Sequence, residues 1–77
     1  MQPIVTTRAA INTLGKEFEN LEIYFPPGKK FAVAVPLYHN KRHVYFEDYS
    51  DAEVYQTDLK YEHYEAVIID TKGKIYL

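Results

Sequence analysis

The 77-residue sequence contains no cysteine. The fold therefore cannot rely on disulfide bonds, and redox or zinc sites made from paired cysteines are excluded. Long apolar runs are also missing, because no window approaches the roughly 18 apolar residues of a membrane-spanning helix. The N-terminal MQPIVTTRAA has no apolar run behind a basic segment, unlike a secretory signal. Together these absences predict a cytoplasmic protein.

A basic excess is missing as well. The formal net charge is −2 and the isoelectric point is about 5.8, whereas a dedicated nucleic-acid binder usually needs a basic surface. Residues 1–42 carry six Lys or Arg against three Glu, residues 43–70 carry Lys60 against eight acidic residues, and residues 71–77 add two lysines. We therefore expect an electrically polarised surface.

The composition is that of one folded domain spanning residues 1–77. Apolar residues make up 47% of the chain and aromatic residues 16%, which is enough apolar surface to offset the entropy lost on folding. A chain of this length has room for one modest core. We predict an α+β domain in which one N-terminal helix packs on a small antiparallel β-sheet of four to five strands.

The N-terminal helix is predicted near residues 7–20. Apolar residues recur there at intervals of three and four, as one buried helical face requires; they are Ala10, Ile11, Leu14, Phe18 and Leu21. Thr6 or Thr7 could supply the N-cap oxygen, whereas Gly15 disfavours a helix by about 1 kcal/mol relative to alanine. On this prediction Leu14 and Phe18 pack against the apolar residues of the sheet, namely Val33, Val35, Val44 and Ile68.

Strand patterns follow this segment. Strand-forming residues indicate strands at 21–25, 30–38, 43–47, 65–70 and 74–77. Turn sequences separate them at 26–29 and 39–42, and a hairpin turn at 70–74 has Gly73 available for a positive φ. Residues 30–38 are apolar on both faces, which predicts an interior strand, and the short last strand predicts a sheet edge.

Residues 50–62 fit both a helix and a strand. Ser50 and Glu53 have the spacing of a capping box, and Ala52, Tyr55 and Leu59 follow at helical intervals. The sequence EVYQT, by contrast, has strand propensity, and alternate residues from 55 to 61 fit one strand face. Either structure leaves the carboxylates at the surface, because burying an unpaired carboxylate costs several kcal/mol.

The segment from Glu47 to Glu65, EDYSDAEVYQTDLKYEHYE, holds seven of the eleven acidic residues and four of the eight tyrosines. The acids could simply solvate a surface, and about half of the tyrosines are expected to serve ordinary packing. The alternative is a recognition surface, because tyrosine beside a carboxylate suits an arginine-rich partner. We predict a partner-binding site made of Glu47, Asp48, Tyr49, Asp51, Glu53, Tyr55, Asp58, Tyr61, Glu62, Tyr64 and Glu65.

The function that this pattern favours is non-catalytic binding to a protein with a basic surface. In size, lack of cysteine and local acidity, the chain resembles small phage-encoded inhibitors that block host nucleases, some by imitating the charge of DNA. The resemblance covers composition only and rests on no residue motif. It implies an inhibitor that occupies the nucleic-acid-binding surface of a host defence enzyme. We expect no cofactor and no membrane partner, and homo-oligomerisation stays open.

Direct nucleic-acid binding is the second hypothesis. Basic residues flank the strand expected at 30–38, and nearby tyrosines could stack on bases; these basic residues are Lys29, Lys30, Lys41 and Arg42. A strand of that length would separate the two basic turns by roughly 25–30 Å at 3.3 Å per residue. The turns therefore form no single patch, and nucleic-acid binding is the weaker hypothesis.

A third hypothesis is a small metal- or histidine-dependent hydrolase or ribonuclease. His39 and His43 have the spacing of some zinc sites, with His63 or a carboxylate as third ligand, but the flanking strands indicate a turn there and not a helix. Histidine beside Lys41 and Arg42 could also serve acid–base cleavage of RNA. The sequence shows no activated nucleophile and no phosphate-binding glycine loop. We therefore expect no enzymatic activity, no catalytic residue and no metal site.

Overall fold

The computed structural model describes residues 5–13, 17–35 and 42–76. These residues form, in chain order, β1 (Val5–Thr13), β2 (Glu17–Phe25), β3 (Phe31–Ala34), β4 (Val44–Phe46), α1 (Tyr49–Tyr61), β5 (Val67–Asp70) and β6 (Ile75–Tyr76). β1 and β2 form a two-stranded ribbon, and the other strands form a four-stranded sheet in the order β4-β3-β5-β6. Every pairing is antiparallel. The predicted α+β class with a small antiparallel sheet is confirmed.

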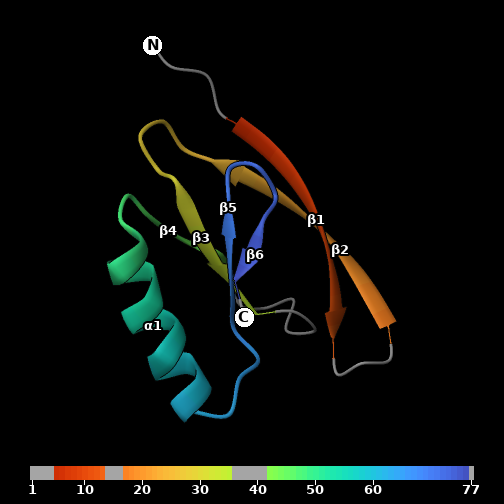
Figure 1. Cartoon of the computed structure of the whole chain (residues 1–77), viewed down its shortest axis with the longest axis vertical. Helices are drawn as coiled ribbons and strands as arrows, with labels where there is room; N and C mark the ends of the chain where they lie inside the picture. The colour runs from red at the N-terminus through yellow and green to blue at the C-terminus, as the bar shows by residue number, and fades with distance from the viewer. Residues whose placement is uncertain (1–4, 14–16, 36–41, 77) are drawn as a thin grey trace.

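The four-stranded sheet lies between α1 on one face and the β1–β2 ribbon on the other (Figure 1). Side chains alternate along each strand, so β3 and β5 contribute to both interfaces. Val33 and Ile68 pack with Leu59 of α1, whereas Ala32 and Ile69 pack with Phe25 of β2. The prediction of an interior strand with two apolar faces is confirmed for β3.

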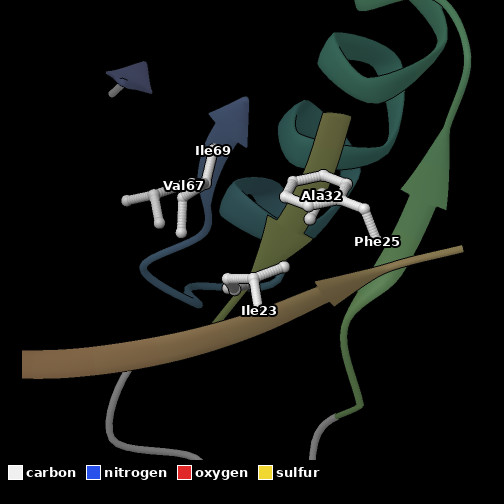
Figure 2. Close-up of a cluster of buried hydrophobic side chains, with 6 residues drawn as sticks. Ile23, Phe25, Ala32, Val67 and Ile69 are labelled. Atoms are coloured by element: carbon white, nitrogen blue, oxygen red, sulfur yellow. The ribbon is translucent and has the colours of Figure 1, made fainter. Parts of the chain in front are cut away.

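The end of β2 attaches the ribbon to the sheet. Ile23 and Phe25 are fully buried, and Figure 2 shows them facing Ala32 on β3 and the two β5 residues Val67 and Ile69. Fully burying an isoleucine or phenylalanine side chain contributes about 1.5–3 kcal/mol. This contact therefore fixes one end of the ribbon against the sheet.

The prediction of a helix near residues 7–20 is wrong. Residues 5–13 pair with residues 17–25 in continuous register, from Val5 opposite Phe25 to Thr13 opposite Glu17. Helical spacing of apolar residues is compatible with two strands, and the β-branched residues of β1 favour a strand. The expected helical placement of Phe18 is therefore also wrong, since it lies in β2. The predicted packing of its side chain, like Leu14, lies outside what the structure describes.

α1 covers the face of the sheet that the N-terminal helix was expected to cover. Its buried residues, Ala52, Gln56 and Leu59, recur at helical intervals. The helix alternative for residues 50–62 is thus confirmed. The predicted capping box is not, because the N-cap is Asp48 and its side chain makes no capping hydrogen bond. Within the described ranges no helix has the length and apolarity needed to cross a membrane.

Two of the predicted turns are confirmed. In the first, the amide of Lys29 donates to the carbonyl of Pro26 over 3.1 Å, and Gly28 has a φ of +86° that other residues rarely adopt. In the second, Gly73 has a φ of 85° and its amide donates to the Asp70 carbonyl over 3.1 Å. The turn expected at 39–42 lies mostly outside the described residues.

Candidate functional site

The acidic residues of the predicted partner-binding site lie on α1 and at its two ends. All of them are exposed: Glu47, Asp48, Asp51, Glu53, Asp58, Glu62 and Glu65. The acidic segment thus forms a helix, since α1 spans Tyr49–Tyr61. The solvent-exposed side and both ends of this helix carry the acids.

The solvent-facing side of α1 carries an uncharged stripe, here called the outer face, formed by Ser50, Val54, Thr57 and Tyr61. All four are exposed, and the side chain of Val54 is 63% exposed and that of Tyr61 87%. At about 100° per residue they fall within roughly 60° of one another around the helix axis. The same geometry places Asp51 and Asp58 along one side of the stripe and Glu53 and Lys60 along the other. The outer face is therefore a narrow, partly apolar surface with carboxylates on one side and a carboxylate and a lysine on the other.

The four tyrosines of the segment divide by environment. Tyr49 is 38% exposed, and its ring packs edge-on against Phe31 at 5.6 Å and Tyr76 at 5.3 Å. Tyr55 is half-buried against Phe46, with ring centroids 5.8 Å apart. Tyr64 is half-buried against the core cluster that contains Leu59. Tyr61 alone among the four has most of its surface available to a partner.

The helix dipole separates the acids of the segment into two kinds. Asp48 and Asp51 lie at the N-terminal end of α1, where negative charge is favourable. Asp58 lies in the last turn and Glu62 is the C-cap, where carbonyl groups already carry partial negative charge. Each unfavourable placement costs about 0.3–1 kcal/mol at low salt, and like charges four residues apart add a further penalty. Asp58 and Glu62 therefore do not stabilise the helix.

The chain leaves α1 through a turn with a left-handed residue. The amide of His63 donates to the Lys60 carbonyl over 2.9 Å, and the amide of Tyr64 donates to the Leu59 carbonyl over 3.0 Å. This hydrogen-bond pattern places His63 where glycine is preferred, and its φ is 72°. The turn returns Tyr64 to the core and leaves Glu62 and Glu65 in solvent.

The basic residues considered for nucleic-acid binding do not meet in the described part of the chain. The amide of Lys30 donates to the Phe46 carbonyl over 2.9 Å, so this turn lies beside Glu47. Arg42 is exposed and precedes β4, at the opposite end of the β3–β4 pair. Lys41 lies outside the described residues. One basic turn is thus next to the start of the acidic segment.

The histidines are placed separately in the fold. His43 is half-buried before β4, and burial lowers its pKa. His63 is exposed after α1, and His39 lies outside the described residues. In the parts of the chain that the structure describes, no group of three or more His, Cys, Asp or Glu could hold a metal ion.

Asp70 is an acidic residue with a structural role. Its Oδ1 accepts hydrogen bonds from the amides of Lys72 at 2.8 Å and Lys74 at 2.9 Å, and its Oδ2 accepts one from the Tyr76 hydroxyl at 3.2 Å. Partial desolvation opposes ionisation, but these hydrogen bonds and the Lys74 charge together lower the pKa of Asp70. Its carboxylate therefore stabilises the β5–β6 turn.

Of the four outer-face residues, Tyr61 was predicted from the sequence, whereas Ser50, Val54 and Thr57 were missed. Val54, in particular, was part of a segment that fitted a strand as well as a helix. The seven-residue interval between Val54 and Tyr61 places them on one helical face, but the interval has this meaning only once the helix is established.

Comparison with known proteins identifies no relative. No protein-family model matches the chain, and neither the curated proteins nor the solved structures give a significant match. The function is therefore inferred from the geometry and chemistry of α1.

Proposed function

We propose that the protein is a non-catalytic binding module that uses the outer face of α1 and its acidic border to contact a basic protein surface. The observation that carries this proposal is the exposure of Val54 and Tyr61, 63% and 87%, beside the carboxylates of Asp51, Glu53 and Asp58. Tyrosine is enriched at the energetic centres of interfaces, and surrounding polar residues commonly form the rim. The outer face has this organisation, with a small apolar centre and charged residues around it.

Arginine is the partner residue that this surface fits best. The ring of Tyr61 offers a π-face for a guanidinium group, which is attracted by about 0.5–2 kcal/mol depending on desolvation. Asp58 precedes Tyr61 by three residues and so lies beside it on the helix. A carboxylate there can accept two parallel hydrogen bonds from the same guanidinium group. Lysine would satisfy the charge but not this paired geometry.

Proteins that process nucleic acids are the partner class with such basic surfaces. We propose that the module occupies the nucleic-acid-binding surface of such an enzyme, in the manner of a small inhibitor. The chain's net charge is −2, whereas a DNA duplex carries about one negative charge per 1.7 Å of its length. The proposed contact is therefore local and uses an aromatic anchor as well as charge.

The test compares two exposed tyrosines. Tagged wild-type protein is used to capture a partner from lysate of cells in which the protein occurs, and Tyr61→Ala and Tyr24→Ala are then measured against that partner. Tyr24 is the matched control, since it is 53% exposed and lies on β2. We expect Tyr61→Ala to weaken binding by at least about tenfold, as loss of an interface anchor does, and Tyr24→Ala to bind normally. Equal binding by both variants would overturn the proposal, as would loss of binding only in Lys29→Ala/Lys30→Ala/Lys41→Ala/Arg42→Ala.

A further inference from the structure

β1 presents a long strand edge that has no partner strand in the described part of the chain. It pairs with β2 on one side, from Val5 opposite Phe25 to Thr13 opposite Glu17, in continuous register. The end of β1 and the start of β2 project away from the four-stranded sheet (Figure 1). The N–H and C=O groups of such an edge are a template for pairing with another strand.

The residues of β1 do not protect this edge. Natural edge strands are usually short, carry several charges, or contain a proline or a bulge. β4 and β6, the edges of the four-stranded sheet, have three and two residues. β1 has nine residues, VTTRAAINT, with five β-branched residues, one charge and no proline. β2 is equally long but carries three glutamates, so β1 is the edge whose composition favours pairing.

We propose that β1 pairs antiparallel with β1 of a second copy of this chain, so that two ribbons form one four-stranded sheet. An antiparallel pair of identical strands has two-fold symmetry, and each copy therefore uses the same surface. A two-stranded ribbon alone is at best marginally stable in water, whereas a sheet of three or more strands with a hydrophobic face can be stable. Small domains commonly gain stability through oligomerisation. This dimer is independent of the partner proposed for α1.

Charge selects the register of the pairing. Full overlap of the nine residues is centred on Ala9, so that Val5 lies opposite Thr13 of the second copy and Arg8 opposite Ala10. A shift that centres the pair on Arg8 would place the two arginines directly opposite each other, which is destabilising. The register centred on Ala9 avoids this repulsion and pairs the outward-pointing N–H and C=O groups along the whole strand.

Two substitutions at one position test this register. In the dimer, Ala10→Arg places an arginine opposite Arg8 of the second copy, whereas Ala10→Glu places a carboxylate there. Position 10 faces Asn20 within its own ribbon, so neither variant meets a charged residue directly opposite in the monomer. Light scattering and sedimentation should show wild-type particles of twice the 9.0 kDa chain mass. The dimer Kd should be at least about tenfold weaker for Ala10→Arg than for Ala10→Glu, because each charge pair occurs twice.

A cysteine cross-link provides a second test that does not depend on the folding of the position-10 variants. The chain has no cysteine, and Ala9 lies on the two-fold axis, where opposite Cα atoms are about 4.5–5.5 Å apart. This separation suits a disulfide. Ala9→Cys should therefore form a covalent dimer under mild oxidation, whereas Thr13→Cys should not, because its two copies are roughly 27 Å apart at 3.4 Å per residue. A wild-type protein that stays monomeric at all concentrations, a dimer Kd equal in both position-10 variants, or equal cross-linking of both cysteine variants would overturn the proposal.

Discussion

The side-chain amide of Gln56 donates a hydrogen bond to the main-chain carbonyl of Tyr76 over 3.2 Å. The same nitrogen donates to the Ala66 carbonyl over 3.1 Å. Gln56 is 4% exposed, and no buried side-chain nitrogen or oxygen in the described residues lacks a partner. The paired amide makes burial of a polar group tolerable. It ties α1, which carries the outer face, to the C-terminal strands.

Replacing Gln56 with leucine should destabilise the fold by about 2 kcal/mol. The change keeps a similar volume but leaves the carbonyls of Ala66 and Tyr76 without their donor, and an unsatisfied buried acceptor costs about 1–3 kcal/mol. Urea unfolding measures the difference, with exposed Thr57→Leu as a control expected to stay within about 0.5 kcal/mol of wild type. A Gln56→Leu protein as stable as the control would show that these hydrogen bonds contribute nothing.

Asp70 should make stability depend on pH in the acidic range. Its pKa is lowered in the folded protein, so its contribution is present above the unfolded-state value of about 3.9 and is lost as pH falls through the folded value. Asp70→Asn keeps an acceptor for the Lys72 and Lys74 amides but removes the charge. We expect a loss of at most about 1 kcal/mol at pH 7, because Asp70 is only half-buried and solvent screens its charge.

The two proteins should become equally stable at low pH, where Asp70 is protonated. Urea midpoints measured from neutral to strongly acidic pH check this convergence. A stability difference that stays constant, or that grows as pH falls, would contradict the assignment of the Asp70 carboxylate as a charged acceptor.

His63→Gly should stabilise the protein. A residue other than glycine at a φ of 72° costs roughly 1 kcal/mol, and glycine adopts this conformation without penalty. For a domain of this size, a gain of 1 kcal/mol raises Tm by about 4–8 °C. His63→Ala is the control, since it also removes the imidazole but keeps a Cβ at the positive φ and so gains nothing from the backbone. A Tm that falls in His63→Gly would show that the histidine side chain contributes more than its backbone costs.

Much of the four-stranded sheet could be predicted from the sequence because its signals are local. Residues 31–34 and 67–69 are short apolar runs between turn sequences, and Gly73 marks the turn whose φ requires it. The position of β6 at an edge also follows from its short length.

The end of β2 was predicted as a strand at 21–25. The rest of the ribbon could not be predicted in this way because its strands are defined by pairing. Ile11, Phe18 and their apolar neighbours fit one helical face equally well, and only the register of Val5 with Phe25 and of Thr13 with Glu17 distinguishes the two structures. Such pairing is not encoded in the spacing of residues along a single segment. Tertiary packing of an apolar face decides between helix and strand when propensities conflict.

For the candidate site, the exposure of the acids could be predicted from the sequence, but the arrangement of the tyrosines could not. The exposure of its acids follows from the cost of burying charge, which depends little on the local structure. The division of its tyrosines into packed and exposed residues depends on α1, since Tyr55 and Tyr61 lie on different sides of the helix. Val54 became part of the surface only through that helix.

Binding by α1 is tested most directly by a variant whose stability and affinity should change in opposite directions. Asp58→Lys/Glu62→Lys replaces acids that oppose the helix dipole with cations that favour it, so the free energy of unfolding should rise by about 0.5–1 kcal/mol. The matched variant Asp48→Lys/Asp51→Lys changes the net charge equally but should lower stability. The decisive measurement is the Kd of Asp58→Lys/Glu62→Lys for the partner captured by the wild-type protein. We expect an affinity at least about tenfold weaker in this more stable protein; unchanged affinity would mean that its carboxylates only solvate the surface.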